Sequence, residues 1–211
     1  MTEPWEATAA LVDPVRRRLY EHVRGQPRPV TRDEAARATG VSRGLAAFHL
    51  DKLVEVGLLT AGYGPRPGTP RRPGRSPKVY RPSDVQLSLA IPERRYDLLG
   101  DILVDAVATE PHNAGEAAER IAHERGAAIG RAAGRASVLS VLAGIGFEPQ
   151  EGSGHIGLRN CPFHRLAIKA PQLVCVLNQR FLAGVLHGLG GTPYRAVLAR
   201  RPDACCVELR A

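Results

Sequence analysis

All four cysteines of this 211-residue sequence, which can bind metals or act as nucleophiles, occur in its last quarter. Cys161 and His164 lie three residues apart around a proline in "NCPFHRLA", Cys175 follows, and Cys205 and Cys206 are adjacent in "ACCVEL". Thiolates and imidazoles are the ligands of tetrahedral zinc, and thiolates also hold iron–sulfur clusters. Cysteine is equally a common buried residue, so a ligand site and a packed core are both open.

The secondary structure around these residues decides whether their side chains can lie close together. Cys161 is expected at the end of a strand, before a turn, and Cys175 in the first turns of a long helix that begins at Pro171. The stretches "YRAVLARR" and "CCVELR" are predicted to be strands. Because neighbours along a strand face opposite sides, only one of Cys205 and Cys206 is expected to point at a given site. There is no C-x2-C pair, which would be the stronger signal of a metal site.

Catalysis is not predicted from these residues. A thiol nucleophile needs a base that a third group holds in place. The sequence shows no such third group near Cys161 and His164. The glycine pairs of "GIGFEP" and "GLGGTP" do not form the phosphate-binding G-x-G-x-x-G pattern. The N-terminus lacks the features of a signal peptide, and no apolar run approaches the roughly 20 residues of a membrane helix. We therefore expect a cytoplasmic non-enzyme, without a membrane partner, whose cysteines are thiols or ligands.

Positive charge is concentrated in the first half of the chain. Residues 1–92 hold 15 Lys and Arg against 9 Asp and Glu, whereas residues 93–211 hold 14 against 12. A basic half joined to a nearly neutral half indicates that the first half meets a polyanion such as DNA. The chain is rich in arginine throughout, so charge alone does not identify DNA as the partner.

Patterns in the first 60 residues predict consecutive short helices. Apolar residues recur at helical spacing over residues 5–23, with a break expected at Pro14. The stretch "TRDEAARATG" opens with a Thr-x-x-Glu capping box and ends on a glycine. Ser42 is the expected N-cap of the next helix, "RGLAAFHLDKLVEV". Two short helices joined by a tight turn and followed by a strand are typical of a helix-turn-helix.

A hairpin with a basic loop is expected next. "LLTAGY" and "KVYRPS" alternate like two strands, and the chain between them contains several prolines and no acidic residue. Prolines keep such a loop extended, so its cations can follow a phosphate backbone. We interpret it as a DNA-contacting wing, with a linker as the alternative. The basic residues between Ala61 and Pro82 are Arg66, Arg71, Arg72, Arg75, Lys78 and Arg81.

These segments resemble a known family. "LVDPVRRRLYEHV", "VSRGLAAFHLDKLVEVGLL" and "GRSPKVYRPS" resemble the first helix, the recognition helix and the second wing strand of ArsR-like winged helix-turn-helix regulators. The resemblance spans about residues 5–92 and implies this fold and binding to double-stranded DNA. By this resemblance, Ser42, Arg43, Gly44, Ala47 and Phe48 lie on the groove-facing side of the recognition helix. The predicted DNA-binding residues are these five, His49 and Lys52, and the wing residues Arg66, Arg71, Arg72, Arg75 and Lys78.

Alternatives remain for several of these side chains. Arg43 can reach a guanine edge or only a phosphate. His49 and Lys52 either touch phosphate or pack within the domain. Phe48 either contacts thymine methyl groups or packs against the first helix. Since Ala47 and Phe48 stand where hydroxyl or basic residues are usual, we expect few polar contacts to bases.

The second half is predicted to contain further helices and two hairpins. "YDLLGDILVDAVATE" has an apolar stripe suited to pairing two copies, with packing inside one chain as the alternative. In the following helix, Gly126, Gly130 and Gly134 share one face and would let another backbone approach closely. The fold class is thus α+β. We expect a winged helix-turn-helix domain at 1–92, linking and dimerisation helices at 93–135, and a cysteine-containing sensor domain at 136–211.

The C-terminal half resembles, more weakly, the sensor halves of iron–sulfur-responsive repressors in the same superfamily. "IGFEP", "NCPFH", Cys175 and "ACC" follow the order of that pattern, although the last gap is wide and His164 is additional. The resemblance implies a metal site drawn from Cys161, His164, Cys175, Cys205 and Cys206, holding an iron–sulfur cluster or zinc.

The leading hypothesis is a homodimeric transcriptional repressor that binds a palindromic operator and senses a metal or cluster through its cysteines. The first alternative is the same regulator responding to a small organic effector in an apolar pocket, with structural cysteines. An enzyme with a DNA-binding appendage and a nucleoid-type DNA coating protein are the other two.

Overall fold

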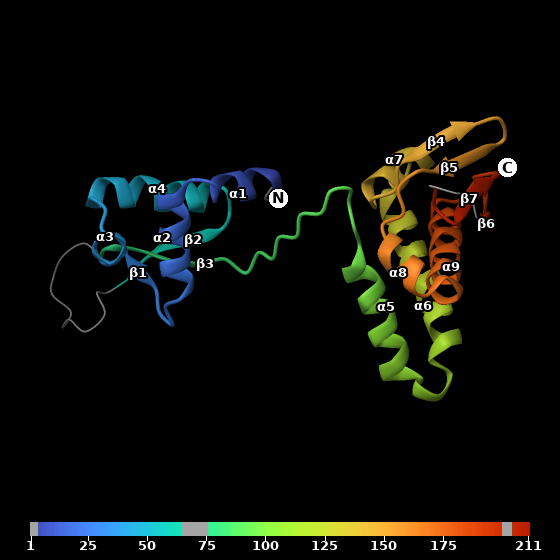
Figure 1. The fold of residues 1–211 in the computed structure, drawn as a ribbon, viewed down its shortest axis with the longest axis horizontal. Helices are drawn as coiled ribbons and strands as arrows, with labels where there is room; N and C mark the ends of the chain where they lie inside the picture. Colours follow the sequence, from blue (N-terminus) through green and yellow to red (C-terminus); the bar gives the residue numbers. More distant parts are fainter. Residues whose placement is uncertain (1–3, 65–75, 200–203) are drawn as a thin grey trace. The chain divides into compact units, whose positions relative to one another are not determined.

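The structure, a computed structural model, describes residues 4–64, 76–199 and 204–211 (Figure 1). The chain divides into two compact units, residues 1–89 and residues 90–211. Both mix helices with a small antiparallel sheet, which confirms the predicted α+β class. None of the helices in the described ranges is long and apolar enough to cross a membrane.

The first unit is a helical cluster backed by a small sheet. The predicted break at Pro14 separates its first two helices, and a left-handed Gly40 separates the next two. Its helices are α1 (Pro4–Ala10), α2 (Pro14–Arg24), α3 (Arg32–Thr39) and α4 (Arg43–Glu55). They enclose a core that includes Leu19, Val23, Leu50, Leu53 and Tyr80.

Local capping explains where α3 and α4 begin. The Thr31 hydroxyl accepts from the Glu34 amide at 3.2 Å, and Glu34 accepts from the Thr31 amide at 2.8 Å, so the predicted capping box is formed. The Ser42 hydroxyl accepts from the Leu45 amide at 3.2 Å, as expected for an N-cap. Gly40, at φ 69°, provides the tight turn that sets α4 against α3.

The small sheet has the order β1-β3-β2 and contains β1 (Val30–Thr31), β2 (Leu59–Tyr63) and β3 (Lys78–Pro82). β2 and β3 are antiparallel, with Ala61 opposite Tyr80, so the predicted hairpin is present. β1 was not predicted, because two residues are too short to show a period. The wing residues Arg66, Arg71, Arg72 and Arg75 lie outside the described residues.

The second unit combines a helical layer with a four-stranded antiparallel sheet of order β4-β5-β7-β6. Its helices are α5 (Tyr96–Thr109), a 3-10 turn (Pro111–Asn113), α6 (Ala114–Ala133), α7 (Val138–Gly144), α8 (His164–Lys169) and α9 (Pro171–Leu189). Its strands are β4 (Pro149–Gly152), β5 (His155–Leu158), β6 (Arg195–Leu198) and β7 (Val207–Arg210). The short helix α8 was not predicted, because we expected only a turn after Cys161.

Glycines let α6 and α9 pack backbone to backbone. A Cβ atom on Gly126 would lie 2.0 Å from the Phe181 carbonyl oxygen, and one on Gly130 would lie 2.3 Å from that of Val185. Gly184 makes the reciprocal approach to α6. The predicted third member, Gly134, instead ends α6 at φ 60°, where a Cβ would meet open space.

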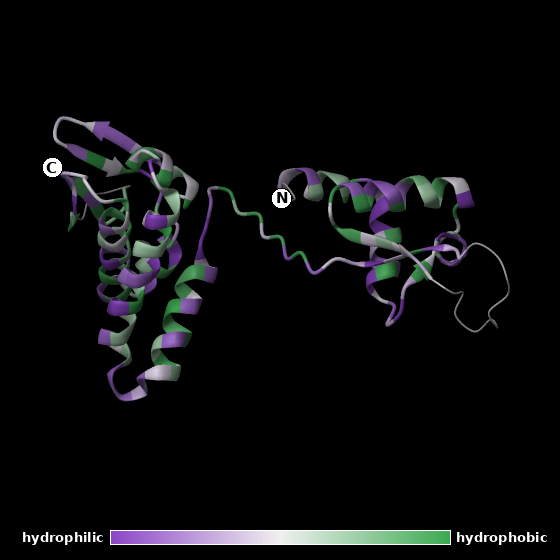
Figure 2. Ribbon diagram, turned by 180° about the vertical axis from the view of Figure 1, so that it is seen from behind, coloured by the Kyte–Doolittle hydropathy of each residue, from purple (hydrophilic) through white to green (hydrophobic). Residues whose placement is uncertain are grey.

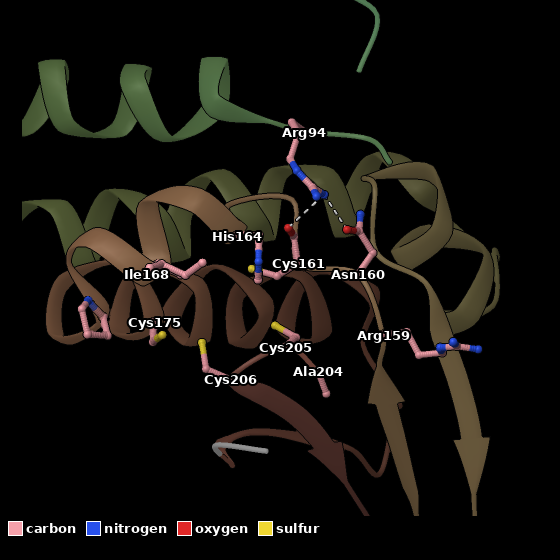
Figure 3. Close-up of a pocket in the computed structure, with 12 residues that line it drawn as sticks. Arg94, Arg159, Asn160, Cys161, His164, Ile168, Cys175, Ala204, Cys205 and Cys206 are labelled. Atoms are coloured by element: carbon pink, nitrogen blue, oxygen red, sulfur yellow. Dashed lines mark hydrogen bonds between the residues drawn. The ribbon is translucent and has the colours of Figure 1, made fainter. Parts of the chain in front are cut away.

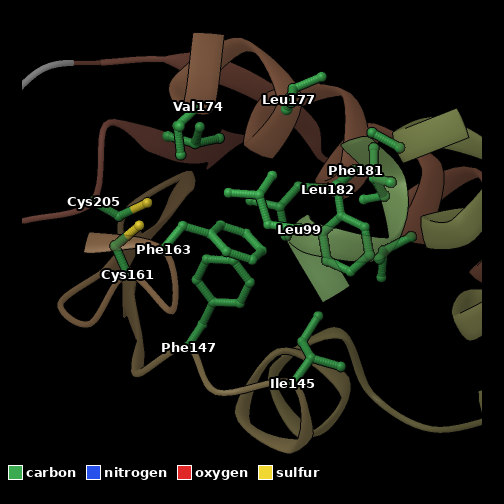
Figure 4. Close-up of a cluster of buried hydrophobic side chains, with 14 of the residues drawn as sticks. Leu99, Ile145, Phe147, Cys161, Phe163, Val174, Leu177, Phe181, Leu182 and Cys205 are labelled. Atoms are coloured by element: carbon green, nitrogen blue, oxygen red, sulfur yellow. The ribbon is translucent and has the colours of Figure 1, made fainter. Parts of the chain in front are cut away.

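One core joins the helices α5, α6, α7 and α9 of the second unit to its strands β5 and β7. Phe163 lies between Phe147 and Phe181, at ring-centre distances of 6.5 and 6.4 Å and near-perpendicular angles (Figure 4). Leu99 of α5 is buried in the same cluster. The helices that we expected to link two domains, within 93–135, therefore share one core with the sensor residues.

Candidate functional site: a thiol pocket and an exposed helix face

A pocket of about 520 Å³ in the second unit brings all four cysteines together (Figure 3). We call it the thiol pocket. The loop after β5 supplies Cys161, α8 supplies His164 and Ile168, and α9 supplies Cys175. The segment before β7 supplies both Cys205 and Cys206. Every residue of the predicted ligand set therefore lines the thiol pocket.

The position of Cys205 and Cys206 corrects one prediction. Both precede β7, which begins at Val207, so the alternation of side chains along a strand does not apply to them. Cys205 is buried and Cys206 is partly buried, and both side chains line the thiol pocket. The apolar residues of "CCVELR" run without interruption into β7, so the sequence did not show that the strand begins only at Val207.

Hydrogen bonds link the four thiols in a chain. Cys205 bonds with Cys161 and with Cys206, and Cys206 also bonds with Cys175. Donation from Cys205 lowers the pKa of Cys161, and donation from Cys205 and Cys175 lowers the pKa of Cys206 to about 6 despite burial. The same bonds, together with burial, raise the pKa of Cys205. Cys205 therefore keeps its single proton, and because a charge on Cys206 raises the pKa of Cys161, the thiolate is favoured on one of these two neighbours at a time.

A buried amide lies beside these sulfurs. Asn178 of α9 is almost fully buried, and its Nδ2 donates to the Cys205 sulfur at 3.2 Å. Its Oδ1 has no hydrogen-bond partner among the described residues. Asn178 was not predicted from the sequence. The available signal was a polar residue one helical turn after Cys175 within an otherwise apolar stripe.

The loop before Cys161 is held by a second buried amide. Asn160 Nδ2 donates to the Gly146 carbonyl at 2.6 Å and to the Glu93 carbonyl at 3.1 Å. Arg94 Nη1 donates to Asn160 Oδ1 at 2.5 Å and to the Cys161 carbonyl at 3.4 Å (Figure 3). The segment that leads into α5 is therefore bonded directly to the Cys161 turn.

The thiol pocket suits a soft metal in its donor types. Cysteine sulfur with one imidazole is a set that zinc and iron–sulfur clusters accept. Among residues 4–64, 76–199 and 204–211, however, no group of three or more His, Cys, Asp or Glu side chains is arranged to hold a metal ion. The donors are thus gathered in one pocket but are not directed at one point.

In the first unit, α4 presents a face opposite its buried side. Ser42, Arg43, Gly44 and Phe48 are exposed, and Ala47 is partly exposed. Phe48 does not pack into the core, since 56% of its surface is accessible. This excludes full burial of Phe48 against the first helix.

Other predicted DNA-binding residues have partners within the unit. His49 is buried, and its Nδ1 accepts from Arg16 Nε at 3.4 Å, so it packs rather than facing outward. Lys78 Nζ bonds Asp51 at 2.6 Å, and Lys52 pairs with Glu55 at 2.7 Å. Asp51 also accepts from the Tyr80 hydroxyl at 2.8 Å, which ties α4 to β3.

Comparison with known proteins identifies part of the first unit. Residues 11–60 match the family model of a helix-turn-helix domain. Neither the curated proteins nor the solved structures gave a match to the chain. The matched segment runs from the start of α2's capping turn through α4 to β2, the layout expected of the motif. The chain therefore contains a helix-turn-helix DNA-binding domain, of the kind found in transcriptional regulators, at residues 11–60.

Proposed function

We propose that this protein is a transcriptional regulator whose second unit senses through the thiol pocket, by binding a metal ion or an iron–sulfur cluster. The observation that carries the proposal is the meeting of four cysteines, from three separate chain segments, in one pocket beside His164. Hydrophobic packing alone does not require thiols to gather in this way.

The residues that would hold the metal or cluster are Cys161, Cys175, Cys205 and Cys206, with His164 as a further donor. The bound group would supply a bridge between the loop after β5, α9 and the segment before β7. Cysteine thiols must lose their protons to become ligands. Occupancy of the thiol pocket would therefore respond to metal supply and to redox conditions. Asn178 would donate a hydrogen bond to a ligand sulfur, an outer contact that orients ligands and tunes their basicity.

In this proposal, hydrogen bonds around the Cys161 turn would carry the signal out of the pocket. Arg94 and Asn160 bond the Cys161 turn to the segment immediately before α5. The Arg95 amide also donates to the Pro162 carbonyl at 3.2 Å. Movement of the turn on binding would therefore pull on the chain that leads back to the DNA-binding unit. In this proposal the effector acts by favouring one arrangement of that chain over another.

The second candidate is a small organic effector, with the cysteines acting as structural residues. The volume of the thiol pocket lies within the range of small-molecule sites, and Ala167, Ile168 and Pro171 give it apolar walls. An organic effector also does not require three or more donor side chains to point at one metal ion. This agrees with the described residues, among which no such group is found.

Protein purified without oxygen is expected to carry iron and sulfide, or zinc, in stoichiometric amount. Removing that group should change DNA affinity by about tenfold, a typical coupling between two sites. Cys161→Ser combined with Cys206→Ser should abolish both the bound group and the response, because two of the donors are lost. Elemental analysis, visible absorption and fluorescence anisotropy with promoter DNA measure these effects.

The matched control is Ala204→Ser, which changes the pocket wall and leaves every thiol in place. It should retain the bound group and the response. Metal-free protein that still responds to cell extract, with the double variant responding equally, would support the organic effector instead.

We also propose that α5 pairs two copies of the chain, so that the dimer binds a palindromic operator. One helix-turn-helix covers only a half-site, which makes two-fold pairing useful. On α5, Val104 and Val107 are 67% and 57% exposed, and Leu103 lies beside them partly buried. Figure 2 shows hydrophobic residues along much of this helix.

The double variant Val104→Asp, Val107→Asp is expected to be monomeric and to bind DNA at least tenfold more weakly, because charge replaces the apolar contact and half of the binding surface is lost. Sedimentation velocity measures the mass. The control Ala128→Asp, Ala132→Asp places the same charge on exposed positions of α6 and should leave the dimer intact. A wild-type chain that is already monomeric would rule out the pairing.

A further inference from the structure

The outward face of the recognition helix α4 is apolar at its N-terminal end. Leu45 and Phe48 are 41% and 56% exposed, although both are large hydrophobic residues. They lie three residues apart and are therefore neighbours on the helix surface. A Cβ atom on Gly44 would meet nothing within 4 Å, so the surface beside Phe48 is open to close approach. The opposite side of the helix is buried through Ala46, His49, Leu50 and Leu53.

Charged side chains around this face already have partners in the first unit. Arg43 Nε lies 2.7 Å from Asp33 Oδ1, across the turn between α3 and α4. The other two pairs are Lys78 with Asp51 and Lys52 with Glu55. The apolar side chain of Leu45 cannot form an ion pair, and Phe48 contacts the His49 ring edge-on, at 5.2 Å between ring centres. Within the described part of the chain, the exposed large side chains of this face that are not in ion pairs are therefore hydrophobic.

The chemistry of the major groove limits what these side chains can contact. Base edges there offer hydrogen-bond donors and acceptors, and the C5-methyl group of thymine is the apolar feature. In a helix-turn-helix, residues near the start of the second helix reach the base edges. Leu45 and Phe48 occupy that part of α4, and the net positive charge of residues 1–92 favours approach to DNA.

We propose that Leu45 and Phe48 read thymine through its methyl group, so that this regulator selects half-sites by apolar contact more than by hydrogen bonds. This inference rests on the proposed DNA-binding function of α4 and adds the chemical feature that α4 selects. Each methyl group in contact contributes about fourfold to affinity, from the burial of one carbon. Two such contacts give a preference of about tenfold or more over the same site without methyl groups.

The test begins with the full-length protein and a library of random duplexes, from which bound sequences are enriched. One enriched duplex is then made with uracil in place of thymine in its half-sites, since uracil pairs identically and lacks only the methyl group. Wild-type protein is expected to bind the uracil duplex about tenfold more weakly. Phe48→Ala should bind the thymine duplex more weakly and should lose most of the difference between the two duplexes.

Two controls separate this effect from others. Uracil placed only outside the half-sites should not change affinity. Val12→Ala, at another exposed apolar position of the same unit, should keep the full preference for thymine.

Equal wild-type binding to both duplexes, or full discrimination by Phe48→Ala, would overturn methyl readout while leaving DNA binding intact. A Phe48→Ala change that alters oligomeric mass and not DNA binding would assign the face to a protein partner. If no duplex is enriched at all, the proposed function fails together with this inference.

Discussion

Gly184→Ala is expected to destabilise the second unit by about 3 kcal/mol or more, as strong overpacking does. A Cβ atom at Gly184 would lie 2.0 Å from the His123 carbonyl oxygen and 3.0 Å from the Ala127 amide nitrogen. Both atoms belong to the backbone of α6, so neither can rotate away, and relief requires α6 and α9 to separate. Alanine favours a helix over glycine by only about 1 kcal/mol, so the collision decides the sign.

Urea denaturation of the full chain measures this effect. Circular dichroism follows both units, whereas Trp5, the only tryptophan of the chain, reports the first unit alone. The expected result is an early loss of helical signal with an unchanged Trp5 transition. Gly115→Ala is the matched control within α6, because a Cβ there would meet nothing within 4 Å. Equal stability of both variants would show that α6 and α9 do not pack as closely as described.

Neutralising the wing arginines is expected to have the largest effect on DNA binding. The variant Arg71→Ala, Arg72→Ala, Arg75→Ala should weaken binding by one to two orders of magnitude at low salt, by a rough count of lost phosphate contacts. Each contact releases counterions, so the slope of log affinity against log salt should become shallower by about 3. All duplex sequences should be affected alike, because phosphates carry no sequence information.

Anisotropy titrations over a series of salt concentrations, on one enriched and one scrambled duplex, measure this slope. The control removes the same charge from the second unit, with Arg120→Ala, Arg125→Ala and Arg180→Ala. These side chains are exposed and paired with acidic residues there, so their loss should change stability little. An unchanged slope in the wing variant would mean that the loop is only a linker.

The two DNA variants test different parts of the proposed interface. Loss of wing charge should weaken all sequences and change the salt dependence. Loss of Phe48 should change sequence preference and leave the salt slope as it was, since no charge is removed. Together they separate positioning on the duplex from selection of the bases.

Local sequence determined most of the secondary structure. The Thr31–Glu34 capping box, the Ser42 cap, the break at Pro14 and the proline that opens α9 are signals contained within a few residues. Their energetics depend on the adjacent backbone, so one sequence suffices to read them. The helix-turn-helix followed from the same signals, and the match over residues 11–60 confirms it.

Contacts between distant segments could not be predicted from these local signals. The glycine pattern of α6 predicted a close partner, but only packing identified α9, with Gly184 and Gly188, as that partner. Similarly, the exposure of Phe48 and the burial of His49 depend on how α4 sits against α2, which a helical period does not specify to one residue.

The cysteines show the same division. Their residue types and order in the sequence indicated a ligand set, because thiols and imidazole have that chemistry wherever they occur. Only the tertiary structure gathered them, since Cys161, Cys175 and Cys205 come from separate segments that meet where the sheet, α8 and α9 pack together. It also decided that both Cys205 and Cys206 line the pocket, because the start of β7 is set by pairing with β5 and β6 and not by the apolar run alone.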